Sequence, residues 1–587
     1  MSDSPAPVVE HMIPTVGASI IFRVKSLLLQ GRRVLTDAVD RSAKKTKKST
    51  SLIDRPVIGD SRSALWTESD HRERALVAGK IQNLRLAVAR IDGCEVEAGE
   101  VFSFWKNVGR ANKRRGFVAG RELREGCIIP NVGGGLCQLS NALFESAVKA
   151  NLEIVERHAH TQVIPGSNAE KGRDATVFWN YVDLRFRSPR PFRIEASLSK
   201  GHLSVRLRGE KIDQPVLHQL SRTTNGNGHL GSCATCGIDD CFRSMNEPAG
   251  VDFGRTAFLV DEFMPEFDDY IRSTRKPADQ LFIPIDGKRF RRANYAWDTN
   301  GFSTVRQNAY LTAVRSYRSR RLAAQGAERQ RNLLAMYERL AEAYARSLSY
   351  DVLHVVAQQQ LLPYLWRDGH LGGRTFDVLM NALPMAEIQS RLDAAARLHP
   401  ESTTLGDFRA DAGLLSSETD ALAAARKVIT PHTDIADMFA ERAERIEWNR
   451  PEPRSTSRIA GDEPVIVFPA STVGRKGCYE LREAIRGLNV RLLTLGPYIE
   501  GADFWQGFDV ERGGDDWLAR ADLVVLPAFV EHRPHRLILA AASGIPVIAS
   551  EACGVTGLAG VTAIPAAEAI VLRDRIVKLL SVSVSSC

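Results

Sequence analysis

ADLVVLPAFVEHRPHRLILAAASGIPVIAS, residues 521–550, places two short apolar runs on either side of a helix-like segment of small residues. Both runs are rich in Val, Ile and Leu and end in turn-forming or small residues, as fully buried strands do. A strand, a helix and a second strand in this order make the unit of a parallel sheet. The stretch therefore predicts a doubly wound α/β domain near the end of the chain.

Similar runs extend this pattern toward the amino terminus. They are PVIVFPA (464–470) and VRLLTLG (490–496) nearby, and TAFLVDEF (256–263), YDVLHVVA (350–357), TFDVLM (375–380) and RKVITPH (426–432) farther away. The polar segment PEPRSTSRIAGDEP (451–464) separates the two groups. We therefore expect two such sheets with a cleft between them, in domains 251–450 and 451–587.

The part of the chain before residue 211 has different sequence patterns. Residues 73–91 repeat apolar positions every three or four residues, which indicates a helix, and residues 175–188 and 192–209 alternate apolar and polar positions, which indicates antiparallel strands. These patterns predict a mixed α+β domain over 76–210. A linker at 211–250 and a basic tail at 1–75 complete the expected organisation.

The tail combines an amphipathic segment with lysines. Residues 17–39 have the spacing of an amphipathic helix, and Lys44, Lys45, Lys47 and Lys48 follow it. The apolar run 19–29 is interrupted by Arg23 and Lys25, so we expect neither a transmembrane helix nor a secretory signal. The interpretation is a cytoplasmic chain, whose residues 17–50 either contact the inner, anionic face of the membrane or remain a flexible basic tail.

Overall composition sets further limits. The chain has 587 residues, of which 44% are hydrophobic and 25% charged, as in globular proteins. A net charge of +8 is small for this length and gives no argument for a nucleic-acid partner. The nine cysteines are scattered and odd in number, which argues against a disulfide framework.

Cys137 lies in NVGGGLCQLS (131–140), directly before a helical pattern. A cysteine at a helix amino terminus is in a setting that favours the thiolate. His158 or His160 would supply a base and Asp174 would orient it, giving a Cys-His-Asp set. The alternative is an inert, buried cysteine in a tightly packed glycine loop.

Several stretches in order resemble one family. FSFWKNVGRANKRRGFVAGRELREG (102–126), GGGLCQLSNALFESAV (133–148), ERHAHT (156–161), GRDATVFWN (172–180) and DLRFRS (183–188) look like the VanW family over about residues 80–210. The motif positions are Gly133, Gly134, Gly135, Cys137, Gln138, Ser140, Arg157, His160, Asp174 and Asp183. Asn141 stands where the family usually has Thr. The resemblance implies the domain but supplies no reaction.

A cysteine cluster follows in HLGSCATCGIDDC (229–241). His229, Cys233, Cys236 and Cys241 have the residue types and spacing of a structural zinc site. The alternatives are an iron–sulfur cluster with a fourth ligand elsewhere and reduced thiols without metal.

Residues 465–488 predict a strand, a loop with Gly474, Arg475 and Lys476, and then a helix. Two cations at such a junction suit a diphosphate, because the helix amino terminus also attracts anions. A carboxylate after a parallel strand, here Glu531, commonly holds ribose or sugar hydroxyls.

The two stretches 465–488 and 521–550 resemble the carboxy-terminal half of GT-B glycosyltransferases, which transfer sugars from nucleotide donors with retention. Residues 256–450 resemble the other half more loosely. The resemblance places Arg475 and Lys476 at the donor diphosphate and makes Glu531 the first of the paired glutamates. The second glutamate is replaced by Leu539, which cannot accept a hydrogen bond from a ribose hydroxyl. Asn381 stands where the family has a catalytic histidine, for which His354 is a looser candidate.

The leading hypothesis is therefore an α+β VanW-like domain followed by an α/β GT-B-like pair of Rossmann-type domains. It would transfer a sugar from a nucleotide-diphosphate donor to a glycan or lipid-linked acceptor in envelope or surface glycan synthesis. The alternatives are a cysteine-dependent enzyme centred on Cys137 and a non-catalytic binding protein with a degenerate glycosyltransferase fold.

Overall fold

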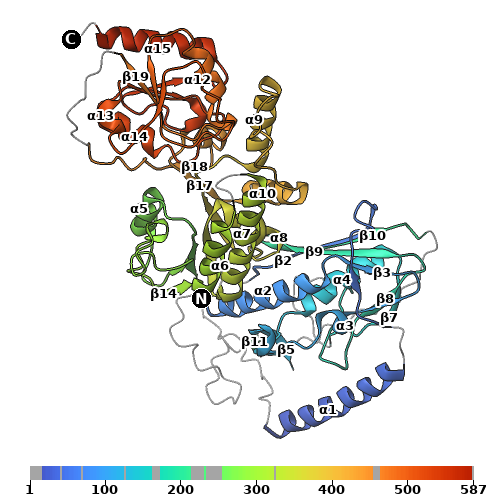
Figure 1. Cartoon of the computed structure of the whole chain (residues 1–587). Coiled ribbons are helices and arrows are strands. Elements are labelled where there is room, and N and C mark those ends of the chain that lie inside the picture. Colours follow the sequence, from blue (N-terminus) through green and yellow to red (C-terminus); the bar gives the residue numbers. More distant parts are fainter. Residues whose placement is uncertain are drawn as a thin grey trace, which may run out of the picture. The chain divides into compact units, whose positions relative to one another are not determined.

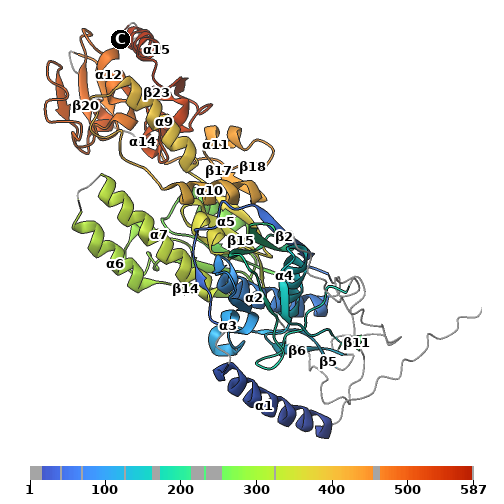
Figure 2. The ribbon, with the colours of Figure 1, turned by 90° about the vertical axis from the view of Figure 1, so that its right-hand side faces the viewer.

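A computed structural model of the chain describes residues 16–39, 43–67, 71–124, 127–160, 172–212, 231–232, 254–322, 326–453 and 463–584. The chain divides into two compact units (Figures 1 and 2). The amino-terminal unit comprises Met1–Arg255, Ser349–Leu353 and Asp368–Arg374. The carboxy-terminal unit comprises Thr256–Leu348, His354–Arg367 and Thr375–Cys587.

An antiparallel sheet is the centre of the amino-terminal unit. Its five strands have the order β1 (Lys47–Lys48), β3 (Cys94–Val96), β9 (Phe192–Leu198), β10 (His202–Gly209) and β2 (Val57–Ala64). Helix α2 (His71–Ile91) contacts β9, and helix α4 (Cys137–Lys149) contacts β2 and β10. Alternate residues of β10, namely Leu203, Val205 and Leu207, join the hydrophobic core, which is the pattern expected of a half-buried strand. The predicted hairpin of β9 and β10 is confirmed.

Smaller elements surround this sheet. One three-stranded sheet has the order β4 (Val101–Ser103), β8 (Arg185–Arg187) and β7 (Glu153–Glu156). Another has the order β11 (Gly231–Ser232), β6 (Cys127–Val132) and β5 (Ala119–Arg124). The remaining helices are α1 (Val16–Val39) and the short α3 (Phe104–Val108), whose Phe104, Trp105 and Val108 belong to the core. The predicted α+β class is confirmed for this unit.

The first of the two parallel sheets has seven strands. Its order is β14 (Thr304–Gln307), β13 (Gln280–Ile283), β12 (Arg255–Leu259), β15 (Val352–Gln358), β16 (Thr375–Leu379), β17 (Lys427–Thr430) and β18 (Ala443–Arg445). The accompanying helices are α5 (Pro265–Thr274), α6 (Ala309–Arg320), α7 (Ala327–Ser347), α8 (Leu362–Arg367), α9 (Met385–Leu398), α10 (Ala412–Ala424) and α11 (Thr433–Met438).

The second parallel sheet has six strands. They are β21 (Val510–Arg512), β20 (Arg491–Thr494), β19 (Val465–Phe468), β22 (Leu523–Leu526), β23 (Val547–Ser550) and β24 (Val561–Ile564). Its helices are α12 (Cys478–Ala484), α13 (Trp517–Arg520), α14 (His535–Ala542) and α15 (Ala569–Val584). Every residue of β19 and β22 is buried, because helices cover both faces of such a sheet.

Both sheets have the strand order of a doubly wound fold. In each, the first strand in the sequence pairs with the second on one side and the fourth on the other. Loops that leave the first and fourth strands therefore diverge at the carboxyl edge and form a crevice, where ligands bind in this class of fold. The predicted pair of Rossmann-type sheets is confirmed, and the crevices define where to look for a site.

Candidate functional site

The glycine turn before Cys137 allows close approach of two backbone segments. Gly133 and Gly135 have positive φ angles of 86° and 92°. A Cβ atom on Gly134 would lie 2.3 Å from the carbonyl oxygen of Gly120. Because a side chain has no room here, the turn requires glycine, and it delivers the chain into α4 with Cys137 as its first residue.

Asp174 fixes the position of His160. The Nδ1 atom of His160 lies 2.6 Å from Oδ1 of the fully buried Asp174, and Oδ2 of Asp174 accepts a hydrogen bond from the backbone N–H of His160. The Cys137 side chain lies close enough to His160 to raise the pKa of that ring, and its thiol donates to the Val177 carbonyl at 3.8 Å. The structure thus brings Cys137, His160 and Asp174 together as a chain of thiol, imidazole and carboxylate.

The start of α4 also holds the segment that carries Asp174. The Ser140 hydroxyl donates to the Ala175 carbonyl at 2.5 Å, and the Asn141 side-chain oxygen accepts from the Ala175 N–H at 2.8 Å. Gln138 donates to the Ala64 carbonyl at 2.7 Å and so ties α4 to β2. These bonds set the distance between Cys137 and the histidine–aspartate pair.

The electrostatics favour a charged histidine. Burial alone would lower the pKa of His160, but its hydrogen bonds to Asp174 and Cys137 raise it to about 10. A histidine with this pKa holds its proton at neutral pH, which is the state that stabilises a neighbouring thiolate. The site is also accessible, because Cys137 is only partly buried and the His160 side chain is 20% exposed.

Two other predicted residues have different partners. Nε2 of His158 lies 3.3 Å from a carboxylate oxygen of Glu156, so the structure assigns the contact with Cys137 to His160 and not to His158. Asp183 accepts hydrogen bonds from the Ser103 hydroxyl at 2.6 Å and from the Trp105 N–H at 3.1 Å, and holds the start of α3. Asp183 is therefore a structural residue.

In the carboxy-terminal unit, Lys476 and Glu531 form a buried ion pair. Nζ of Lys476 lies 2.9 Å from Oε2 of Glu531, and Oε1 accepts from the N–H groups of His532 and Arg533, each at 2.8 Å. Burial raises the pKa of Glu531, but the Lys476 charge and these bonds outweigh it and hold the pKa at about 2. Two of the four predicted donor-binding residues therefore bind each other.

The loop amide at Gly474 is occupied by another carboxylate. Oε1 of Glu500 accepts from the Gly474 N–H at 2.7 Å and from the Ser402 hydroxyl at 2.8 Å, and it also contacts the Thr404 hydroxyl. Oε2 accepts from the Tyr479 hydroxyl at 3.0 Å. A carboxylate of the chain itself therefore sits where the sequence predicted a donor phosphate. The sequence carries no local signal for Glu500, because its partners at 402–404 and 474 are distant in the chain.

Arg475 packs against an aromatic ring. Its guanidinium carbon lies 4.3 Å from the ring centroid of Phe408, and burial lowers the pKa of the side chain. Leu539, on α14, packs against the hydrophobic core. His354 lies within β15, with Nδ1 2.8 Å from the Thr375 hydroxyl and Nε2 3.1 Å from Asp377.

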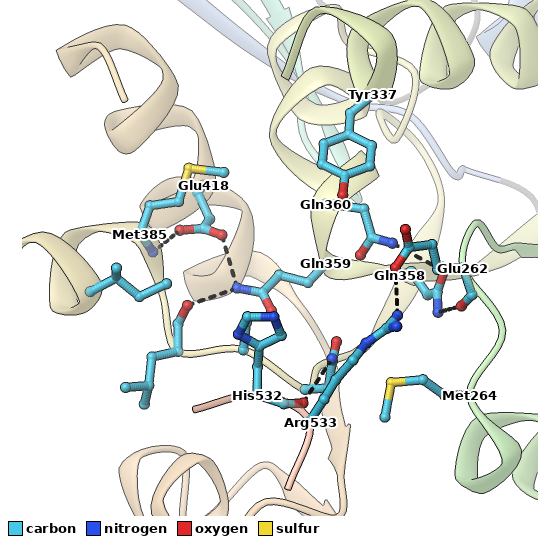
Figure 3. A pocket seen from close by; sticks show the side chains of 14 residues that line it. Glu262, Met264, Tyr337, Gln358, Gln359, Gln360, Met385, Glu418, His532 and Arg533 are labelled. Atoms are coloured by element: carbon cyan, nitrogen blue, oxygen red, sulfur yellow. Dashed lines mark hydrogen bonds and ion pairs between the residues drawn. The ribbon is translucent and has the colours of Figure 1, made fainter. Parts of the chain in front are cut away.

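A cavity of about 190 Å³, lined by both polar and apolar residues, lies at the carboxyl edge of the first parallel sheet (Figure 3). Its lining comprises Glu262, Met264, Tyr337, Gln358, Gln359, Gln360, Asn381, Ala382, Leu383, Met385, Ile388, Glu418, His532 and Arg533. Glu262 follows β12, Gln358 ends β15 and His532 follows β22, so the cavity lies at the crevice of the first sheet and beside the loop after β22 of the second. His354 is not among these residues, whereas Asn381 is.

Charge pairs and amides shape this cavity. Arg533 lies 2.5 Å from Glu262, and the Gln359 amide donates to Glu418 at 3.1 Å (Figure 3). Burial and the Lys476 charge lower the pKa of His532 to about 4, so its ring is neutral at pH 7. Amides, carboxylates and a neutral imidazole offer both donors and acceptors, which suits a ligand with hydroxyl groups. The sequence signal for this cavity was the run of three glutamines, Gln358, Gln359 and Gln360, after a predicted strand. This run matches no motif, so the sequence did not predict the cavity.

The predicted zinc ligands His229, Cys233, Cys236 and Cys241 lie outside the described residues. Within the described ranges, no three His, Cys, Asp or Glu side chains are grouped so as to hold a metal ion. The same part of the chain contains no helix with the length and apolar character needed to cross a bilayer.

These observations define an α+β domain with a cysteine–histidine–aspartate cluster and, separately, a pair of doubly wound sheets with a cavity of mixed polar and apolar lining. Residues 79–208 match the family described as VanW like protein, which confirms the predicted VanW-like domain. The uncharacterized protein YoaR of Bacillus subtilis is 32% identical over 142 residues, which are 24% of this chain and 46% of YoaR. The vancomycin B-type resistance protein VanW of Enterococcus faecalis is 33% identical over 128 residues, 21% of this chain and 46% of that protein.

The chain thus spans about half the length of these curated relatives. Among solved structures, it is similar to Anabaena Alr3699/HepE in complex with UDP and glucose, with 14% identity and a TM-score of 0.35. That match covers 56% of this chain and 90% of HepE.

Proposed function

We propose that the VanW-like domain is a thiol-dependent enzyme in which Cys137 accepts an acyl group. The observation that carries this proposal is the contact of Cys137 with His160, whose ring is held by the buried Asp174. A nucleophile, a base and an orienting carboxylate linked in this order are the parts that nucleophilic catalysis needs.

In the proposed reaction, the Cys137 sulfur attacks the carbonyl carbon of an ester or amide. The bond from that carbon to the leaving group breaks, and the leaving group takes the proton held by His160. A thioester on Cys137 remains. Water or an acceptor hydroxyl or amine then attacks it while His160 takes the attacking proton, which releases the acyl product and restores the protonated histidine.

Incubation of the full chain with p-nitrophenyl acetate tests this proposal. We expect a burst of p-nitrophenol and an acetyl group on the peptide that contains Cys137, identified by mass spectrometry. Cys137→Ser and His160→Ala variants should lose the burst. Acetylation that remains unchanged in His160→Ala would contradict the role of the histidine.

A second candidate function concerns the cavity of the carboxy-terminal unit. We propose retaining transfer of a sugar from a nucleotide-diphosphate donor to an envelope or surface glycan, with the diphosphate at Gly474, Arg475 and Lys476 and with Glu531 at the sugar. The supporting observation is the cavity at the crevice of the first doubly wound sheet, which the loop after β22 of the second sheet also lines. Its volume of about 190 Å³ is below the roughly 300 Å³ of typical ligand pockets, so it suits a sugar-sized group rather than a whole nucleotide sugar.

This second proposal requires the diphosphate to displace Glu500 from the Gly474 amide. Calorimetry with UDP- and GDP-sugars is the test, using the wild type, Glu500→Ala and Arg475→Ala, with Tyr479→Phe as a control that keeps the Glu500 carboxylate. We expect Glu500→Ala to bind one donor at least about tenfold more tightly, because a like charge no longer competes with the phosphate. Absence of binding in the wild type and in Glu500→Ala would refute donor binding, and unchanged affinity in Arg475→Ala would refute the assigned diphosphate site.

A further inference from the structure

Helix α1 presents a continuous apolar face to solvent. Leu27, Leu28 and Leu35 are 66%, 70% and 71% exposed. The other exposed apolar residues on this face are Ile20, Ile21, Val24 and Val34. Their spacing of three, four and seven residues places them along one side of a helix. An exposed apolar stripe of this length marks an interaction surface.

The opposite side of α1 is the one that contacts the amino-terminal unit. Arg33 pairs with Glu156 and donates to the Tyr181 carbonyl at 3.1 Å. Asp37 lies 2.8 Å from Arg185 and 3.5 Å from Lys106 of α3, next to which α1 is drawn in Figure 2. An amphipathic helix on a globular domain normally turns its apolar side inward, and here the polar side is bound and the apolar side is outward.

The charges beside the stripe indicate what covers it. Lys25 and Arg32 are exposed and lie at its border by helical spacing. Asp37 is the one acidic residue in the sequence of α1, and its charge is turned toward Arg185 and Lys106. The outward face therefore combines apolar side chains with positive charge. That combination is complementary to an anionic lipid bilayer, in which the apolar side chains enter the acyl region and the cations meet the headgroups.

We propose that α1 attaches the amino-terminal unit to an anionic membrane surface, lying in the plane of the interface with Leu27, Leu28 and Leu35 inserted. The ion pairs of Arg33 and Asp37 keep the helix bound to the unit, so the VanW-like domain is held at the lipid surface. This proposal is independent of the reaction at Cys137 and of ligand binding in the carboxy-terminal unit.

Vesicle co-sedimentation of the full chain tests the proposal, with phosphatidylcholine vesicles that do or do not contain phosphatidylglycerol. We expect binding to the anionic vesicles that weakens as salt is raised. Lys25→Glu with Arg32→Glu should lower the partition coefficient by at least about 25-fold, from about fivefold for each basic residue. Leu28→Glu with Leu35→Glu should lower it at least about tenfold, because charged side chains would have to enter the acyl region.

The matched control is Ile53→Glu, which replaces an exposed apolar side chain outside α1 and should bind as the wild type does. Circular dichroism of each variant establishes that the fold is kept. Equal binding to neutral and anionic vesicles, or equal loss in Ile53→Glu, would overturn the proposal. Sedimentation velocity without lipid provides the other refutation: a dimer that Leu28→Glu with Leu35→Glu dissociates, together with no vesicle binding, would make the stripe a subunit interface.

Discussion

The buried pair of Lys476 and Glu531 provides a quantitative prediction. Lys476→Met removes the cation 2.9 Å from a carboxylate that has almost no contact with solvent. The pKa of Glu531 is about 2 in the folded chain, compared with 4.5 for an ordinary glutamate. That difference corresponds to about 3 kcal/mol of stability at neutral pH, in the range for breaking a buried ion pair.

The sign of the pH dependence follows from the lowered pKa. The contribution of Glu531 is complete above about pH 5 and is lost as the pH falls toward 2, because the unfolded chain binds the proton first. In the wild type, the stability of this region should therefore decrease between pH 5 and pH 3 more steeply than in a Lys476→Met, Glu531→Gln double variant.

Urea-dependent hydrogen exchange of peptides that cover β19 and β22 measures the effect within this sheet. We expect Lys476→Met to lower the opening free energy by about 3 kcal/mol at pH 7. The double variant should recover at least about half of this loss, because a glutamine can still accept from the His532 and Arg533 N–H groups. A loss below about 1 kcal/mol in Lys476→Met, or a double variant no more stable than the single one, would refute the structural role of the pair.

Three further predictions concern His160, the glycine turn and the buried cysteines. Asp174→Asn should lower the pKa of His160 from about 10, which nuclear magnetic resonance titration checks. The variant should also lose about 2–3 kcal/mol of stability below pH 6.5, and this loss should decline as the pH rises toward 10, which urea unfolding at two pH values checks. Gly134→Ala should destabilise the unit by at least about 2 kcal/mol because its Cβ would meet the Gly120 carbonyl, whereas Gly201→Ala, where a Cβ meets open space, should change thermal unfolding little. Cys94 and Cys553, whose pKa values burial raises to about 11 and about 12, should remain unlabelled by iodoacetamide at pH 8 while Cys137 is labelled.

Local patterns in the sequence predicted most of the fold. Val465–Phe468 and Leu523–Leu526 are short apolar runs between turn signals, and they form buried parallel strands because that environment selects such runs. The glycine turn predicted the start of α4 at Cys137, and the ordered motifs led to His160 and Asp174. These features depend on residues that are close in the chain or belong to one motif.

Contacts between distant segments could not be predicted in this way. Glu500 follows a strand in an ordinary turn sequence, and only the folded chain brings it to Gly474 and Ser402. The choice between His158 and His160 depended on the folded backbone, which pairs His158 with Glu156 and His160 with Asp174. The orientation of α1 could not be predicted either. An amphipathic pattern shows that a helix has an apolar and a polar face, but it does not show which face packs against the rest of the domain.

The most direct test of the central claim is the rate at which iodoacetamide alkylates Cys137 at pH 7, followed by mass spectrometry of its peptide in the wild type, His160→Ala and Asp174→Asn. If the protonated His160 ring stabilises the Cys137 thiolate, the wild type should react at least about tenfold faster than His160→Ala, with Asp174→Asn between them. Equal rates in the three proteins would contradict a reactive Cys137–His160–Asp174 site.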